Sequence, residues 1–136
     1  MEKEKHNECY TYFSITGDFD VKEITEILKL KPFRYWNKDD VRKDGKPYGF
    51  SCVSFCRIDE YDPYITKQME IVVNEMSKKT KELELIREKY NVKFYLTSVP
   101  SFYVNSIIPS VSPSMMVIDF CSKTRTMLDI DQYIYE

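Results

Sequence analysis

Residues 10–36 constrain the fold of this chain more than any other segment, because a strand, a glycine, a helix cap and a proline follow one another there. Residues 10–16 alternate between two sets of side chains, and most of them are aromatic or β-branched. This period of two predicts a half-buried β-strand. Gly17 follows directly and permits the backbone reversal that we expect at the end of the strand.

A capped helix is predicted after this strand. Asp20 occupies an N-cap position, and Glu23 stands three residues later, where a capping box has its second side chain. An apolar stripe at helical spacing continues from the cap and comprises Ile24, Ile27 and Leu28. Pro32 ends the helix, because the residue before a proline avoids helical dihedral angles.

Length and charge narrow the class of protein. The 136 residues fit a single domain, which we assign to residues 1–136 with residues 1–7 as a frayed tail. The formal net charge of -2 argues against a general nucleic-acid binder, which needs a basic surface. The chain has no apolar run of membrane-spanning length, and its charged start lacks the apolar stretch of a signal peptide. We therefore expect a cytoplasmic protein that binds neither nucleic acid nor a membrane.

The residues that usually carry chemistry are sparse. The four cysteines form no C-x-x-C pair, and the single histidine, His6, lies in the predicted tail. We therefore expect thiols in a reducing compartment, with no metal and no cofactor. Serine and cysteine have no evident base, and three glycines are too few for a phosphate-binding loop. No catalytic residue is predicted, so a binding protein is favoured over an enzyme.

The rest of the pattern predicts three more strands and three more helices. We expect strands at residues 49–58, 92–99 and 126–135, and helices at residues 63–77, at residues 80–90 and after Ser112. Asp62 and Pro63 form a helix start, and one long helix over residues 63–90 is the alternative to two. The order β-α-β-α-α-β-α-β predicts an α+β fold with a four-stranded, mainly antiparallel sheet and helices packed on one face. A ferredoxin-like elaboration is the expected architecture.

The predicted strands share a tyrosine-rich outer side. If they form one sheet, the face away from the helices carries Tyr10, Tyr12, Ser14, Lys93, Tyr95, Thr97, Asp129, Asp131, Tyr133 and Tyr135. Tyrosine is enriched at interfaces, so this face is a candidate surface for a protein partner or a ligand. The alternative is that tyrosine simply suits strands. Base stacking on this face is not expected, because Asp129 and Asp131 would repel phosphate.

Asp129 and Asp131 also form the best carboxylate pair. Two residues apart on one strand, they would face the same side about 6–7 Å from each other. Such a pair can hold a hydrated divalent ion or act as an acid and a base. The alternative is that both are solvated, or paired with Lys93 or Arg125.

The cluster of Arg34, Tyr35 and Trp36 begins a long polar loop and is the second candidate site. These residue types dominate interface hot spots, and together they can clamp an anion or a planar ligand. The alternative is that Trp36 covers the edge of the core while Arg34 pairs with a nearby aspartate.

Three blocks of the chain resemble the bacterial family catalogued as domain of unknown function 4279: FSITGDFDVKEITEILKLKPFRYW, ELIREKYNVKFYLTSVPS and LDIDQYIY. The resemblance spans nearly the whole chain. The family pattern usually has a glycine after the last helix, where this chain has Lys123, Thr124 and Arg125. The resemblance implies a small cytoplasmic bacterial or phage domain and carries no reaction with it. By analogy, such domains often neutralise toxins or act in conflicts between host and phage.

Three functions are therefore considered. The favoured one is a non-enzymatic protein-binding domain, such as an immunity or phage-defence protein, whose partner is a toxin, a defence effector or a second copy of the chain. The alternative is a small-ligand domain in which Arg34, Trp36 and the two aspartates line a pocket. The third is a metal-assisted hydrolase that uses Asp129 and Asp131.

Overall fold

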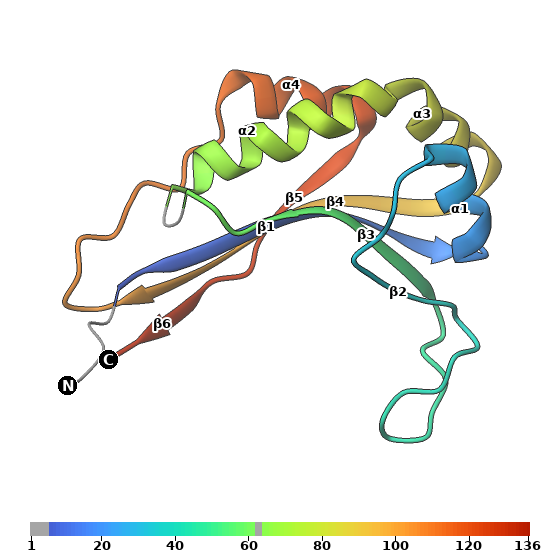
Figure 1. The fold of residues 1–136 in the computed structure, drawn as a ribbon, viewed down its shortest axis with the longest axis horizontal. Helices are drawn as coiled ribbons and strands as arrows, with labels where there is room; N and C mark the ends of the chain where they lie inside the picture. The colour runs from blue at the N-terminus through green and yellow to red at the C-terminus, as the bar shows by residue number, and fades with distance from the viewer. Residues whose placement is uncertain (1–5, 62–63) are drawn as a thin grey trace.

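A mixed β-sheet with helices on one of its faces forms the described part of the chain, residues 6–61 and 64–136 of a computed structural model (Figure 1). The elements in chain order are β1 (Glu8–Asp18), α1 (Val21–Leu28), β2 (Arg34–Trp36), β3 (Ser51–Ile58), α2 (Ile65–Met76), a 3₁₀ turn (Ser77–Lys79), α3 (Thr80–Lys89), β4 (Asn91–Tyr103), α4 (Met115–Thr124), β5 (Thr126–Ile130) and β6 (Tyr133–Tyr135). None of the helices in these residues is long and apolar enough to cross a membrane.

The sheet runs in the order β2-β3-β1-β4-β5, and β6 pairs with β4 beyond the end of β5. β1 lies at the centre, antiparallel to β3 on one side and to β4 on the other. β5 and β6 both run parallel to β4, beside its first and second halves. The parallel pairing follows from α4, because a helical crossover returns the chain to the end of the sheet where β4 began.

The predicted α+β class is confirmed, but the sheet differs from the prediction in detail. Within the described residues it has six strands rather than four, and two of its pairings are parallel. The expected ferredoxin-like elaboration therefore does not describe it exactly. β2 was not predicted because three residues are too short to show a period. The single strand expected at residues 126–135 is interrupted at residues 131–132, which carry the chain from β5 to β6 along the edge of β4.

The predicted helix cap at Asp20 is confirmed, since its carboxylate accepts a hydrogen bond from the Lys22 N–H. The carboxylate of Glu23 instead accepts a hydrogen bond from the Tyr90 hydroxyl, which ties α1 to the end of α3. Two helices rather than one follow β3, and the 3₁₀ turn between them lies where the apolar stripe weakens. The predicted helix start at residues 62–63 lies outside the described residues.

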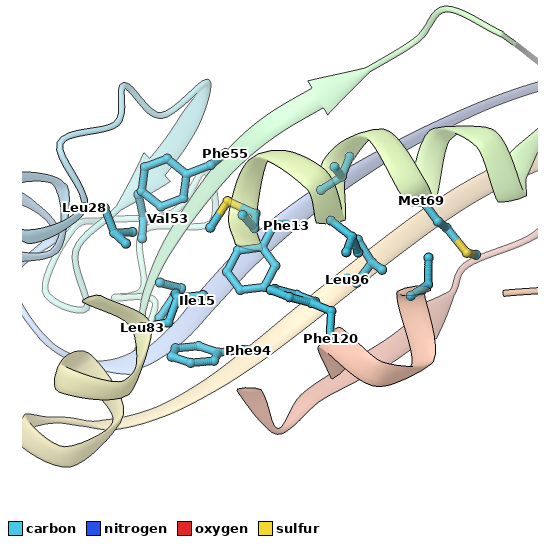
Figure 2. Packing of buried hydrophobic residues seen from close by; sticks show 14 of the residues in the cluster. Phe13, Ile15, Leu28, Val53, Phe55, Met69, Leu83, Phe94, Leu96 and Phe120 are labelled. Carbon is cyan, nitrogen blue, oxygen red and sulfur yellow. The ribbon is translucent and has the colours of Figure 1, made fainter. Parts of the chain in front are cut away.

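The core lies between the sheet and the helices. Phe13 and Ile15 of β1 are fully buried on this side, and Figure 2 shows Phe13 close to Phe120 of α4, with Phe94 nearby. The α2 helix covers the centre of the sheet with a fully or almost fully buried stripe of Ile65, Met69, Val72 and Met76. Because side chains alternate along a strand, Ser14, between Phe13 and Ile15, points to the opposite, helix-free face.

The predicted frayed tail, residues 1–7, needs a correction at Asn7; residues 1–5 lie outside the described residues. Asn7 is buried, and its amide donates a hydrogen bond of 3.0 Å to the Ile107 carbonyl. Its side-chain oxygen accepts hydrogen bonds from the Tyr103 N–H and the Ser106 hydroxyl, both 2.9 Å long. Asn7 therefore fastens the start of β1 to the segment that follows β4.

Candidate functional site

The helix-free face of the sheet, called the open face below, carries residues of both groups predicted to bind. Strand register places these residues in three rows across the sheet: Trp36, Cys52, Thr16 and Lys93; then Arg34, Ser54, Ser14, Tyr95 and Met127; then Tyr12, Thr97 and Asp129. Residues paired across a ladder share a face. The register therefore brings the arginine–tryptophan pair and the tyrosine face, which are far apart in the sequence, to one surface.

A pocket of about 560 Å³ lies on this face. Its middle is lined by the small side chains of the central strands, Ser14, Thr16 and Cys52, beside the fully buried Ser54. Larger side chains stand on either side, from β2 and from β4. These two strands are three strand spacings apart, about 14 Å between their backbones. The pocket is thus a trough, because short side chains of β1 and β3 lie between longer side chains of β2 and β4.

Arg34 forms one side of the trough. Its guanidinium carbon lies 5.2 Å from the centre of the Tyr12 ring and 5.8 Å from that of the Trp36 ring. One nitrogen, Nη2, is 3.5 Å from the Ser54 hydroxyl, at the limit of a hydrogen bond. Within residues 6–61 and 64–136, Arg34 has no carboxylate partner. The alternative, in which Arg34 pairs with a nearby aspartate, is therefore not found there.

Trp36 is held in place by the loop that joins β2 to β3. Its ring stacks on Tyr48 at 4.6 Å with the two planes 17° apart, and its Nε1–H donates a hydrogen bond of 3.1 Å to the Phe50 carbonyl. The Phe50 ring meets it edge-on at 5.8 Å. Figure 1 shows the loop extending away from the helices. Trp36 thus belongs to the open face and does not cover the edge of the core.

The remaining predicted residues divide between this pocket and its surroundings. Tyr12, Tyr95 and Asp129 line it, together with Arg34 and Trp36. Tyr35 does not, because it pairs with the buried Val53 and so points to the opposite face of the sheet. The other three predicted residues lie on or near the open face outside the pocket: Tyr10, Asp131 and Tyr133.

Residues 7–135 of the chain match the family described as domain of unknown function (DUF4279). The chain belongs to this family. No curated protein and no solved structure matches the chain. The match covers the whole sheet and every residue that lines the pocket of this DUF4279 domain.

Several pocket residues of this DUF4279 domain were not among the predicted site residues. Lys93 was assigned to the tyrosine-rich face but not to a site, although it alternates with Tyr95 along the same strand. Phe50 and Cys52 could not be assigned, because residues 49–58 alternate poorly and show no face. Burial explains this pattern, since both faces of β3 are covered over most of its length.

Asp129 and Asp131 do not lie on one continuous strand, which the predicted pair assumed. Asp129 is exposed on β5, whereas Asp131 follows the end of that strand and accepts a hydrogen bond of 3.4 Å from the Tyr133 hydroxyl. The spacing argued from one continuous strand therefore does not apply. Among the described residues, no three histidine, cysteine or acidic side chains gather where they could hold a metal ion.

Cys52 is the thiol nearest to the pocket and is only 4% exposed. Burial raises the pKa of this thiol, while a hydrogen bond shared with Ser54 and the charge of Arg34 offset part of the rise. The raised pKa favours the protonated thiol over the thiolate. Burial likewise raises the pKa of Cys56 and of Cys121. Cys52 is therefore a small floor residue and is not activated as a nucleophile.

Proposed function

We propose that this protein is a non-enzymatic binding domain that holds a small organic ligand in the trough of the open face. One observation carries the proposal: a pocket of about 560 Å³ where Arg34 and Trp36, with Tyr12 beside Arg34, face Tyr95 across a floor of small side chains. Pockets of about 300–1,000 Å³ that combine aromatic walls with a few polar groups are typical of small-molecule sites.

The lining favours binding over catalysis. A nucleophile needs a neighbouring base or a lowered pKa, and Cys52 has a pKa raised by burial. Ser14 and Ser54 share a hydrogen bond of 2.8 Å with each other, and neither contacts a histidine or a carboxylate in the described residues. The cysteine pattern supports a cytoplasmic setting for this binding role.

A fragment screen by nuclear magnetic resonance tests the proposal. The chain has one tryptophan, so the Nε1–H of Trp36 gives a single side-chain signal that reports directly on the pocket. We expect hits from a mixed library of small acids, bases and neutral compounds to shift this signal together with the amides of Ser14, Thr16 and Thr97. The shifts should saturate with ligand concentration.

Matched variants decide whether the hits occupy the trough. Thr16→Phe places a ring on the pocket floor and should abolish the shifts, whereas Ser101→Phe adds the same ring to the open face outside the pocket and should leave them. Phenylalanine suits strands, so both variants are expected to fold. A library without hits, or hits that Thr16→Phe leaves unchanged, would contradict the proposal.

A protein partner is the second candidate function, and exposed apolar side chains favour it. Met127, Ile134 and Tyr135 of β5 and β6 are 45–60% exposed, at the edge of the sheet away from β2. Contiguous apolar surface marks sites that another protein covers, and these side chains come from the two strands at one edge of the sheet. A toxin to be neutralised or a phage-defence effector is the kind of partner that we propose for this edge.

Site-specific photocrosslinking in the native host tests this candidate. A photoreactive residue at Ile134 should give one discrete crosslinked band, and the same residue at Leu85 on α3 should give none, although Leu85 is also exposed. The comparison isolates the β6 edge from general surface stickiness. Equal crosslinking at both positions, or none at either, would speak against a partner at this edge.

A further inference from the structure

We infer that the trough binds a flat organic anion, a ring that carries a carboxylate or a phosphate group. The inference rests on the proposed ligand-binding function and specifies its ligand class. It draws on the charges that line the pocket, on the unused hydrogen-bond donors of Arg34, and on the fixed aromatic walls.

The charges of the trough are unbalanced in favour of an anion. Arg34 and Lys93 line it as cations, and Asp129 is its one carboxylate among the described residues. Asp129 forms an ion pair with neither cation within residues 6–61 and 64–136. Its strand, β5, is four strand spacings from β2, so its backbone lies about 19 Å from that of Arg34.

Neither cation is otherwise engaged with a carboxylate. In the part of the chain that the structure describes, no ion pair involves Arg34 or Lys93. Other surface cations do pair, for example Arg42 with Asp44 and Arg57 with Asp59. Arg34 and Lys93 stand on opposite sides of the small-residue floor, so an anion above this floor is attracted from both sides.

The guanidinium of Arg34 is placed to donate to such an anion. A guanidinium has five N–H donors, and that of Arg34 makes one long contact of 3.5 Å, to Ser54. The rings of Tyr12 and Trp36 lie near the guanidinium and limit its freedom. Its remaining donors can pair with the two oxygens of a carboxylate or with a phosphate, which is the strong bidentate geometry of arginine.

The ring portion of the ligand is inferred from the walls. Trp36, Tyr12, Tyr95 and Phe50 all line the pocket. Trp36 is already fixed by Tyr48 and by its hydrogen bond to the Phe50 carbonyl. A wall that is ordered before binding loses little entropy when a ligand stacks on it. Flat rings match aromatic walls, because offset stacking and edge contacts are both favourable.

Isothermal titration calorimetry with matched probes tests the inference. The ring anions are naphthoate and adenosine monophosphate, their neutral counterparts are naphthamide and adenosine, and the ringless anions are acetate and inorganic phosphate. We expect each ring anion to bind at least about tenfold more tightly than the neutral compound with the same ring, because the anion gains a charge-assisted bidentate contact. We expect the same margin over the anion without a ring, because the ring gains the aromatic walls. The two ring anions distinguish a carboxylate ligand from a phosphate ligand.

Charge variants locate the binding. Arg34→Gln and Lys93→Gln should each lower the affinity for the tighter-binding ring anion about tenfold. Arg34→Lys should lose less affinity than Arg34→Gln, because lysine keeps the positive charge but lacks the bidentate guanidinium. Lys22→Gln removes the same charge from an exposed position on α1 outside the pocket and should leave the affinity unchanged. Arg34 and Lys93 are exposed, so their variants should keep the melting temperature of the wild type.

Each contrary outcome is distinct. Ring anions that bind no better than their neutral counterparts, or equally well to Arg34→Gln, overturn the anion assignment. Ringless phosphate that binds as tightly as adenosine monophosphate removes the ring from the ligand class. If no ring anion binds at millimolar concentration while neutral fragments still shift the Trp36 signal, the ligand class is wrong and the binding function stands. If neither probes nor fragments bind, the proposed function itself fails.

Discussion

Gly17→Ala is expected to lower the free energy of unfolding by about 3–5 kcal/mol, a large part of the stability of a domain this size. Gly17 has a φ of 150°, which residues with a side chain rarely adopt. A Cβ there would lie 2.2 Å from the Asn91 carbonyl oxygen and 3.0 Å from the Val92 Cα. Both are backbone atoms of β4, so relief requires β1 and β4 to separate where Gly17 pairs with Val92.

Urea unfolding of Gly17→Ala and of Gly49→Ala separates two contributions to the free energy of unfolding. One is the steric overlap of the new Cβ with β4, and the other is the cost of a positive φ. Gly49 has a φ of 82°, and a Cβ there would meet nothing within 4 Å. Gly49→Ala should therefore cost only about 1–2 kcal/mol, the ordinary cost of a positive φ. Similar losses in the two variants would show that the close approach of β4 has little energetic weight.

Phe13→Ala is expected to cost about 3–5 kcal/mol, because it removes a ring from the middle of the core. Phe13 is fully buried on the central strand, and its ring centre lies 5.8 Å from that of Phe94 and 6.2 Å from that of Phe120. Figure 2 shows these rings between the sheet and the helices. The substitution would leave a cavity where β1, β4 and α4 meet.

Thermal and urea unfolding should rank three variants. Phe13→Leu keeps most of the volume and should cost less than about 1.5 kcal/mol. Ile107→Ala, at a side chain that is 94% exposed, should stay within about 0.5 kcal/mol of the wild type. If Phe13→Ala lowers the free energy of unfolding no more than Phe13→Leu does, the core must close around the missing ring.

Features that depend on residues close together in the chain were predicted well from the sequence. The cap at Asp20 and the division of the helical region after β3 are both confirmed, since each depends on residues close together in the chain. Gly17 was recognised as a special position, but its role was assigned to a turn. The structure places it inside β1, where its close neighbour is β4, over seventy residues later in the chain.

Strand composition also indicated the open face and its tyrosines. The pairing of β2 with β3 was not predictable, because three residues show no period. The small floor was equally hidden, since Ser14, Cys52 and Ser54 become neighbours only through register. Tyr35 was placed in the site by its position between Arg34 and Trp36 in the sequence. Because side chains alternate along β2, Tyr35 lies on the opposite face of the sheet.

The sequence alone thus determined the α+β class, the helix cap and the family, because these depend on local patterns of residues. Only the tertiary structure decided that Arg34 and Trp36 face Lys93 and Tyr95 across a trough. The physical reason is that strand order and register arise from contacts between distant segments. Strand order and register decide which short side chains form the floor of the trough and which long side chains form its walls.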